Sequence, residues 1–588
     1  MGRYTLCKNP TVSLVQTVTK ITRPFLKKSK IWVSGTKVAN YLLKDPVIDW
    51  LIMYYPKYGF NTNIQLRRRS SSNKSFKTQQ TSNPLFANGN LFEDTVYKEL
   101  CSKFGDDFVN LKGCVQDKDF ENTKTFMLKE TPIIAQAFIK SDAMNLRGVV
   151  DLLVRSDYVN RLVNQPIPEL EDTSKLFYVV IDIKWSNMEL CVDGKTIRNS
   201  GRFRANKGQL LIYTTILEEI QNYPFQMAFI LSKSWKIDKK MAGSNCFERL
   251  GVVDFAGKDR EYVEMTSNAI NWVRDLTING QVWSPMYPHI KEMCCNACNV
   301  DETWDSVKKK IMTETKDVTQ VWMVTPEQRN SVFDKGVRKW DDKRCTTNAL
   351  GINGTTKNTI SNILKVNKSC KETIIMSKEK INWGEITPND FFIDFETISD
   401  EYRVMEKIDI YNGKSSGSLI FMIGVGYICE STGNFVYKNF TSLELSEKGE
   451  SNIIKLLKNF IIERTSTPRF FHWGHVEQTL LASALKRHSI TWESTSWVDM
   501  CKTLVNAHFS VKGSLNFKLK NIATALHRLG YIKTTWDGDD TIKDGMSAMK
   551  KSINFYRNNE GDLKDVIKYN EVDCKVLSEI FLFINRVV

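Results

Sequence analysis

The chain has 588 residues, including 82 Lys and Arg against 67 Asp and Glu, and a net charge of +15. Hydrophobic residues make up 42% and charged residues 25%, as in an ordinary folded protein of about two to four domains. No apolar run approaches the roughly 18 residues of a membrane span, and no signal peptide is evident. These features exclude a membrane protein, a disordered chain and a small secreted scaffold.

The positive charge is concentrated at the N-terminus. Residues 1–80 contain fifteen Lys and Arg but only Asp45 and Asp49, a local charge of +13, so the rest of the chain carries only +2. A basic end on a near-neutral body indicates a polyanionic partner, above all nucleic acid. A solvated tail that aids solubility explains the charge equally well at this stage.

Composition and periodicity divide the chain into four segments. Residues 1–84 are basic, and the polar stretch near 67–83 predicts a mobile loop whose candidate nucleic-acid-binding residues are Arg67, Arg68 and Arg69. Alternating strand and helix patterns predict an α/β domain over 85–299 and another over 388–588. A helical connector and linker is expected over 300–387.

Two strand-like runs of the first α/β segment carry charges in apolar surroundings. FYVVIDIKW places Asp182 and Lys184 on one face of a strand, and GVVDLLV places Asp151 in another such run. Burying these charges is costly unless they meet a metal, a phosphate or each other. An internal ion pair between Asp182 and Lys184 is the structural alternative.

Two helical patterns add further polar residues. Glu93 lies in the pattern GNLFEDTVYKEL, where it could instead complete a capping box with Asn90. Gln209 and Tyr213 are four residues apart on one helical face, which an ordinary amphipathic helix also explains.

In their order, these pieces resemble the RecB-type PD-(D/E)XK nucleases over residues 85–290. That family combines a helical acid, a G-x-x-D motif, a D/E-x-K strand and a Q-x-x-x-Y helix. The matching positions are Glu93, Gly148–Asp151, Asp182–Lys184, Gln209 and Tyr213. The resemblance implies that the three acids bind Mg²⁺ or Mn²⁺ and that the lysine orients the attacking water or stabilises charge. Phosphodiester cleavage needs that chemistry.

A second set of acids lies in the C-terminal segment. FFIDFET places Asp394 and Glu396 on one face of a strand, and DVIKYNEVDCKVL places Tyr569 and Asp573 four apart on a helix. Glu477 begins another helix between them. A retained fold with dead or altered chemistry is the alternative to an active site.

This second set resembles the tyrosine-bearing DEDD exonucleases of the ribonuclease H-like fold over residues 388–588. The resemblance implies that Asp394, Glu396 and Asp573 hold two metals. It also implies that Tyr569 positions the attacking water and that Glu477, where the family has Asp, reaches a metal. The fusion of the two nuclease types is similar to predicted two-nuclease proteins of microbes and large DNA viruses.

Thirteen scattered cysteines predict reduced thiols and an intracellular protein, in the cytoplasm or nucleus. Cys294, Cys295 and Cys298 form CCNAC, and RecB-type relatives often hold an iron–sulfur cluster nearby. Candidates for a fourth ligand are Cys7, Cys246 and Cys345. Reduced structural thiols are the favoured interpretation.

The leading hypothesis is a nuclease of two α/β mixed-sheet domains that uses Mg²⁺ or Mn²⁺ and hydrolyses DNA in preference to RNA. The resemblance implies a role in repair, recombination or replication, with the main hydrolysis at the PD-(D/E)XK site. One alternative is a non-catalytic nucleic-acid-binding protein with degenerate nuclease folds. Another is an RNA-processing exonuclease that uses only the C-terminal domain. No membrane partner is expected.

Overall fold

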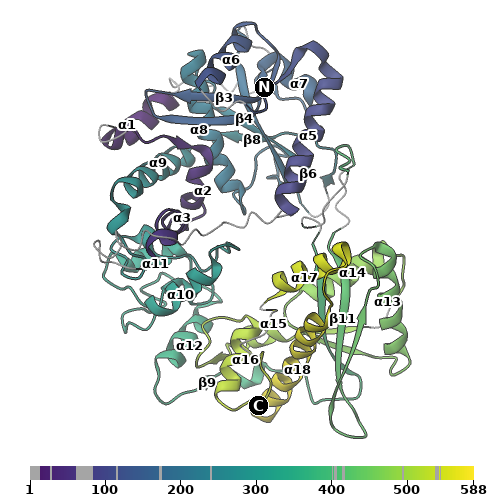
Figure 1. Ribbon diagram of the computed structural model, residues 1–588. Coiled ribbons are helices and arrows are strands. Elements are labelled where there is room, and N and C mark those ends of the chain that lie inside the picture. Colours follow the sequence, from purple (N-terminus) through teal and green to yellow (C-terminus); the bar gives the residue numbers. More distant parts are fainter. Residues whose placement is uncertain are drawn as a thin grey trace, which may run out of the picture. The chain divides into compact units, whose positions relative to one another are not determined.

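Figure 1 shows the computed structural model, which describes residues 13–26, 30–60, 84–113, 117–170, 175–238, 241–399, 402, 407–412, 417–492, 495–536, 542 and 544–587. The chain forms two compact units, Met1–Thr315 with Val404–Ser415, and Lys316–Arg403 with Ser416–Val588. The predicted connector over 300–387 is thus not a separate body, because its first residues belong to the first unit and the rest to the second. None of the described helices has the length and apolar character of a membrane span.

The first unit is built on a mixed eight-stranded sheet in the order β2-β3-β4-β5-β6-β7, with β1 beside β4 and β8 beside β6. Strands β3, β4 and β5 are antiparallel, whereas β6 is parallel to β5, so that a helical crossover, α8, joins them. The strands are β1 (Val33–Ser34), β2 (Phe108–Asn110), β3 (Ile133–Ser141), β4 (Leu146–Arg155), β5 (Tyr178–Glu189), β6 (Met227–Lys236), β7 (Ala242–Gly243) and β8 (Gly251–Asp254).

Helices cover both faces of this sheet, because its central strands bury side chains alternately on each side. Leu153 and Val180 pack with α1, α2, α3, α8 and α9, whereas Leu152 and Ile181, their neighbours along the strands, pack with α5 and α7. The N-terminal helices therefore share the core of the first unit. The helices are α1 (Leu14–Leu26), α2 (Ala39–Leu42), α3 (Val47–Tyr58), α5 (Pro84–Phe104), α6 (Asp117–Leu128), α7 (Ser156–Leu162), α8 (Phe203–Gln221), α9 (Glu261–Asn279) and α10 (Asp305–Thr315).

Residues 407–412, far along the chain, belong to the first unit. Ile408 and Ile410 are buried in the core cluster beneath α5, and the backbone N–H of Cys246 donates to the Ile410 carbonyl at 2.9 Å. The Tyr411 hydroxyl donates to Glu99 of α5. This excursion interrupts the second unit between two adjacent strands, β10 and β11.

The second unit contains a five-stranded sheet in the order β12-β11-β10-β13-β14. The central strand β10 is antiparallel to β11 and parallel to β13. Phe391 and Ile393 pack on one face with α13 and α14, and Phe392 packs on the other with α18. The sheet strands are β10 (Asp390–Ile398), β11 (Leu419–Ile428), β12 (Phe435–Thr441), β13 (Arg469–His472) and β14 (Ser496–Asp499).

A small antiparallel pair, β9 with β15, and eight helices complete the described part of this unit. The pair is β9 (Ile374–Ile375) and β15 (Ser510–Val511). The helices are α11 (Pro326–Phe333), α12 (Lys357–Lys368), α13 (Glu447–Ile462), α14 (Val476–Arg487), α15 (Met500–Asn506), α16 (Leu519–Arg528), α17 (Gly545–Asn558) and α18 (Lys564–Val587).

Candidate active sites

Three carboxylates converge in the second unit. Asp394 and Glu396 lie two residues apart on β10 and therefore share a face, and α18, which contacts β10, supplies Asp573. One oxygen from each carboxylate lies within 4.8 Å of the others, the single group of this kind within the described ranges. Glu396 and Asp573 are buried.

Burial raises the pKa of all three carboxyls, and the charges of neighbouring acids raise it further. Burial raises the pKa of Asp394 well above its ordinary value, and the charges of Asp573 and Glu396 add to this. Burial with the Asp573 charge raises the pKa of Glu396 to about 8, and burial raises that of Asp573 to about 7. Acids that repel one another in a buried site require a positive charge, and hard oxygen donors suit Mg²⁺ or Mn²⁺. This donor set therefore fits a divalent cation.

Asn570 supports the cluster from α18. Its Nδ2 donates to Asp394 Oδ2 at 2.7 Å, and its Oδ1 accepts from the Tyr437 hydroxyl at 2.8 Å. Gly424 on β11 leaves room for this amide, since a β-carbon there would lie 1.7 Å from Asn570 Oδ1. Asn570 lies inside the Y-x-x-x-D motif, but the motif predicts a role only for its tyrosine and its aspartate.

Tyr569 lies next to Asp573, one helical turn earlier on α18. Burial raises the pKa of the Tyr569 hydroxyl, and the charges of Asp573, Asp394 and Glu396 raise it further, so the phenol stays neutral. Lys520 of α16 places its Nζ 4.5 Å from the centre of the Tyr569 ring. No sequence signal marked Lys520.

Glu477 begins α14 beside the cluster but outside the three-carboxylate group. It is buried, and its charge raises the pKa of Asp394 and Asp573. Its Oε2 contacts His472 Nδ1 at 3.2 Å. The nearby Asp499 caps α15, where its Oδ1 accepts the backbone N–H of Lys502 at 2.9 Å.

In the first unit, the predicted residues come from four elements: α5 (Glu93), β4 (Asp151), β5 (Asp182 and Lys184) and α8 (Gln209 and Tyr213). Lys184 Nζ lies 2.6 Å from Asp182 Oδ2 and 3.9 Å from Asp151 Oδ2. Asp151 Oδ2 also accepts the backbone N–H of Ile183 at 2.8 Å. The lysine thus lies close to both acids.

Asp182 is fully buried, and within the described part of the chain its Oδ1 accepts no hydrogen bond. Burial raises the pKa of Asp182 to about 7, although the charge of Lys184 lowers it. Burial opposes the charge of Lys184, but Asp182 and Asp151 raise its pKa above the ordinary value, so the ammonium stays charged. A buried carboxylate oxygen without a donor, close to a second acid, also fits a divalent cation.

Glu93 lies in the middle of α5, which begins at Pro84, so the capping-box alternative is wrong. Its Oε1 accepts from the Tyr97 hydroxyl at 2.7 Å and from Gln136 Nε2 at 2.5 Å. Gln136 has a φ of 54°, and the β3–β4 pairing skips this residue and continues in the same register on either side of it. Burial and the Asp151 charge raise the pKa of Glu93.

Gln209 and Tyr213 interact along α8, where Gln209 Nε2 donates to the Tyr213 hydroxyl at 3.1 Å. The buried Tyr213 ring lies against Gly148 of β4. A β-carbon at Gly148 would lie 2.2 Å from Tyr213 Cε1. The glycine of the G-x-x-D motif is therefore required for close packing of α8 on the sheet.

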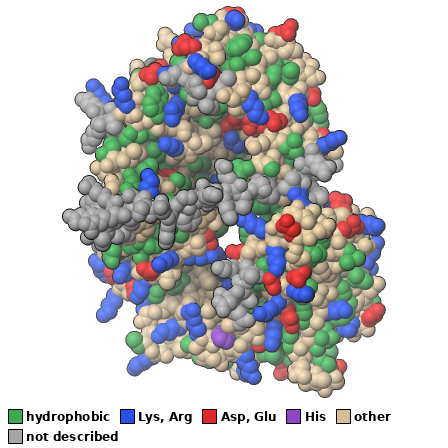
Figure 2. Space-filling view, in the orientation of Figure 1, with side chains coloured by type: hydrophobic (Ala, Val, Ile, Leu, Met, Phe, Trp, Pro, Cys, Tyr) green, Lys and Arg blue, Asp and Glu red, His purple; other side chains and the backbone are tan. Residues whose placement is uncertain are grey.

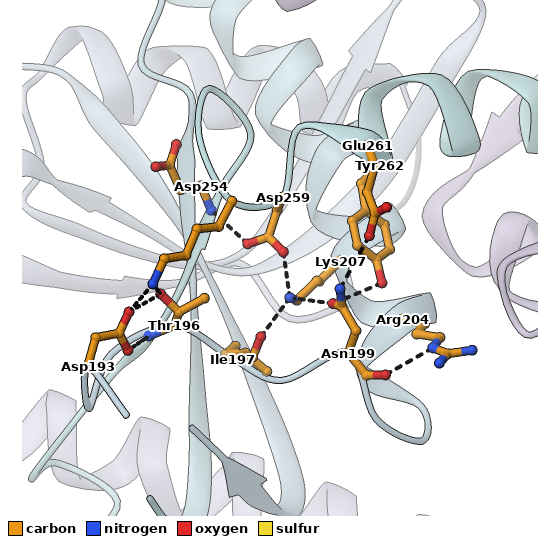
Figure 3. A network of polar contacts seen from close by, with 11 residues as sticks. Asp193, Thr196, Ile197, Asn199, Arg204, Lys207, Asp254, Asp259, Glu261 and Tyr262 are labelled. Atoms are coloured by element: carbon orange, nitrogen blue, oxygen red, sulfur yellow. Dashed lines mark hydrogen bonds and ion pairs between the residues drawn. The ribbon is translucent and has the colours of Figure 1, made fainter. Parts of the chain in front are cut away.

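Lys207 anchors the start of α8, as Figure 3 shows. Its Nζ donates to Asp259 Oδ1 at 2.6 Å, to Asn199 Oδ1 at 2.7 Å and to the Ile197 carbonyl at 2.8 Å. The Lys207 and Asp259 side chains are only 1% and 2% exposed. This buried network holds the helix that carries Gln209 and Tyr213, and the sequence patterns did not predict it.

The cysteine motif is buried at Cys294 and Cys295 and exposed at Cys298. Within the described ranges, no group of three metal-ligating side chains includes them. The backbone N–H of Asn296, inside this motif, donates to Asp45 at 2.9 Å, and Asp45 also pairs with buried Lys308 at 2.5 Å. These contacts tie the segment to the N-terminal helices.

The predicted mobile loop, with Arg67, Arg68 and Arg69, lies outside the described residues, as do nine of the fifteen Lys and Arg of residues 1–80. On the face in view in Figure 2, the Lys and Arg of each unit are scattered among acidic and apolar side chains rather than gathered in one patch. Nucleic-acid binding by the three arginines stays a prediction.

Residues 408–584 match a family model of the RNase H superfamily. The match includes Glu477, Tyr569 and Asp573, whereas Asp394 and Glu396 on β10 precede it. No curated protein and no solved structure matched the chain. The match supports an RNase H-like domain in the C-terminal part of the chain, a fold associated with nucleases that use divalent metals.

Proposed function

We propose that this protein is a metal-dependent nuclease that hydrolyses phosphodiester bonds of nucleic acid. The observation that carries the proposal is the convergence of Asp394, Glu396 and Asp573 in an RNase H-like domain. The raised pKa values of these acids support it, because a buried group of carboxylates that is this costly without a cation is typical of a functional site.

In this proposal, the three carboxylates hold Mg²⁺ or Mn²⁺, which supplies charge neutralisation and Lewis acidity when bound. Asn570 fixes the orientation of Asp394, and the neutral Tyr569 hydroxyl holds the attacking water by a hydrogen bond. Hydrolysis joins the water oxygen to phosphorus and breaks one P–O ester bond. A proton from the water ends on the released alcohol.

A second nuclease centre is proposed in the first unit, on the resemblance to PD-(D/E)XK enzymes. The buried Asp182 oxygen that lacks a donor, close to Lys184 and near Asp151, favours it. The order of elements also agrees, with α5 before three antiparallel strands and α8 crossing to the parallel β6. Here the charged Lys184 would orient water or stabilise the phosphate. The resemblance makes DNA the expected substrate, in repair, recombination or replication.

Cleavage of single- and double-stranded DNA and RNA with Mg²⁺, Mn²⁺ or a chelator tests both centres. The variants are Asp394→Asn, Asp182→Asn and their combination, with the exposed Glu447→Gln as control. We expect metal-dependent cleavage by wild type and control. Each single variant should lose cleavage of some substrates, and the double variant should cleave none of them.

Two outcomes would favour the alternatives. Binding without cleavage under every metal would indicate a non-catalytic nucleic-acid-binding protein. Cleavage of RNA alone, lost in Asp394→Asn and unchanged in Asp182→Asn, would indicate an RNA exonuclease that uses only the C-terminal domain.

A further inference from the structure

Lys520 is a cation beside the three carboxylates of the second unit. It is the second residue of α16, and its side chain is half-buried. Its Nζ lies 4.5 Å from the centre of the Tyr569 ring and 5.0 Å from that of Trp536. Two aromatic faces near one ammonium limit its positions, because each ring attracts the cation. The charge is therefore held at the edge of the cluster.

The same ammonium faces the acids themselves. Its charge lowers the pKa of Asp573 and of Glu396, which come from α18 and β10, against the upward effect of burial. Its position against the Tyr569 ring, one helical turn before Asp573, agrees with this effect. The family match includes this residue, but nothing in the match assigns it a role.

The negative charge of the site gives a reason for a cation such as Lys520. Asp394, Glu396 and Asp573 form the cluster, and the buried Glu477 adds its own negative charge. Two divalent cations would balance four carboxylates but leave the charge of a phosphodiester unbalanced. One further positive charge at the edge of the cluster would balance it.

We propose that Lys520 binds the scissile phosphate of the nucleic acid and stabilises the charge that develops on it during hydrolysis. This inference rests on the proposed function of the second unit. The competing explanation is that Lys520 is only a counter-ion for the acids, with no contact to the substrate. The two roles differ in how a variant responds to metal.

The test uses the full chain with Lys520→Met, Lys520→Arg and the control Lys518→Met. Lys518 is exposed and lies two residues earlier in the sequence, so the control removes the same charge at a neighbouring position. We would measure kcat and KM on a labelled oligonucleotide that Asp394→Asn fails to cleave, over a titration of Mg²⁺ to saturation. Thermal unfolding of each variant verifies its fold, and Lys520→Gln replaces Lys520→Met if that variant is unfolded.

At saturating Mg²⁺, we expect Lys520→Met to lower kcat about 100-fold, as the loss of one charge-stabilising donor does. Lys520→Arg should keep at least about a tenth of wild-type kcat, because a guanidinium is also charged and also binds aromatic faces. Lys518→Met should stay within about twofold.

Two results would overturn the inference. One is a kcat for Lys520→Met equal to that of the Lys518→Met control. The other is recovery of the lost activity at high Mg²⁺, since a mere counter-ion is replaced by metal. If wild type cleaves nothing, the proposed function itself fails, which is a distinct outcome.

Discussion

Replacing Asp573 by Asn should stabilise the metal-free protein, although it removes a proposed metal ligand. Burial raises the pKa of this carboxyl from 3.8 to about 7. The native state therefore holds the proton more tightly than the unfolded state, so the free energy of unfolding falls as pH rises from about 4 to 7 and is level above that. At about 1.4 kcal/mol per pH unit, the charged group costs about 4 kcal/mol at pH 8.

Asparagine cannot ionise, but its amide must still be buried. We therefore expect the free energy of unfolding of the variant to exceed that of wild type by about 2–4 kcal/mol at pH 8. For a domain of this size, that raises the unfolding temperature by about 4–16 °C. The gain should shrink at pH 4.5, where the wild-type carboxyl is protonated in the native state. Saturating Mg²⁺ should stabilise wild type more than the variant and narrow the difference.

Calorimetry in a chelator at pH 8 and pH 4.5 is the assay, because it resolves the unfolding of two units. Glu447→Gln, an exposed acid of the same unit, should change stability by no more than about 0.5 kcal/mol. An Asp573→Asn protein that melts at or below the wild-type temperature in chelator at pH 8 would refute the cost assigned to the buried Asp573 carboxylate.

Other substitutions probe the packing around both sites. Gly148→Ala should cost about 1–3 kcal/mol by thermal unfolding, because its β-carbon would overlap the Tyr213 ring, and a fully stable variant would contradict the packing of α8. Lys207→Met should cost about 3–5 kcal/mol, since it leaves buried Asp259 without its cation, and an unchanged unfolding temperature would show that the pair is not buried. Gly424→Ala should displace the amide behind the three acids and lower nuclease activity at saturating Mg²⁺; wild-type kcat would count against that support.

Periodicity predicted much of the candidate sites. Residues two apart on a strand share a face, so the D-x-E run placed Asp394 with Glu396, and the D-x-K run placed Asp182 with Lys184. Residues four apart on a helix share a face, which brought Tyr569 beside Asp573. These arrangements depend only on local backbone geometry, so they can be read from a sequence without knowing the fold.

Contacts between distant segments could not be predicted in this way. Gln136 reaches Glu93 from a position of β3 with a positive φ, and Asn570 reaches Asp394 through space that Gly424 leaves open. Lys520 meets the acids only because α16 folds against α18. Basic composition marked residues 1–84 as a region of their own, but composition does not show that Val38, Leu42 and Trp50 are buried in the core of the first unit.

The excursion over residues 407–412 has a practical consequence for dissecting the protein. Since the chain passes from one unit to the other three times, at 315–316, 403–404 and 415–416, no single cut yields both units intact. A fragment that begins near residue 316 would expose Ile408 and Ile410 to solvent, and one that ends there would lose the apolar cover of α5. Fragments 1–315 and 316–588 should therefore fold better when they are co-expressed than when either is expressed alone. After proteolysis near residue 316, the two fragments should stay associated.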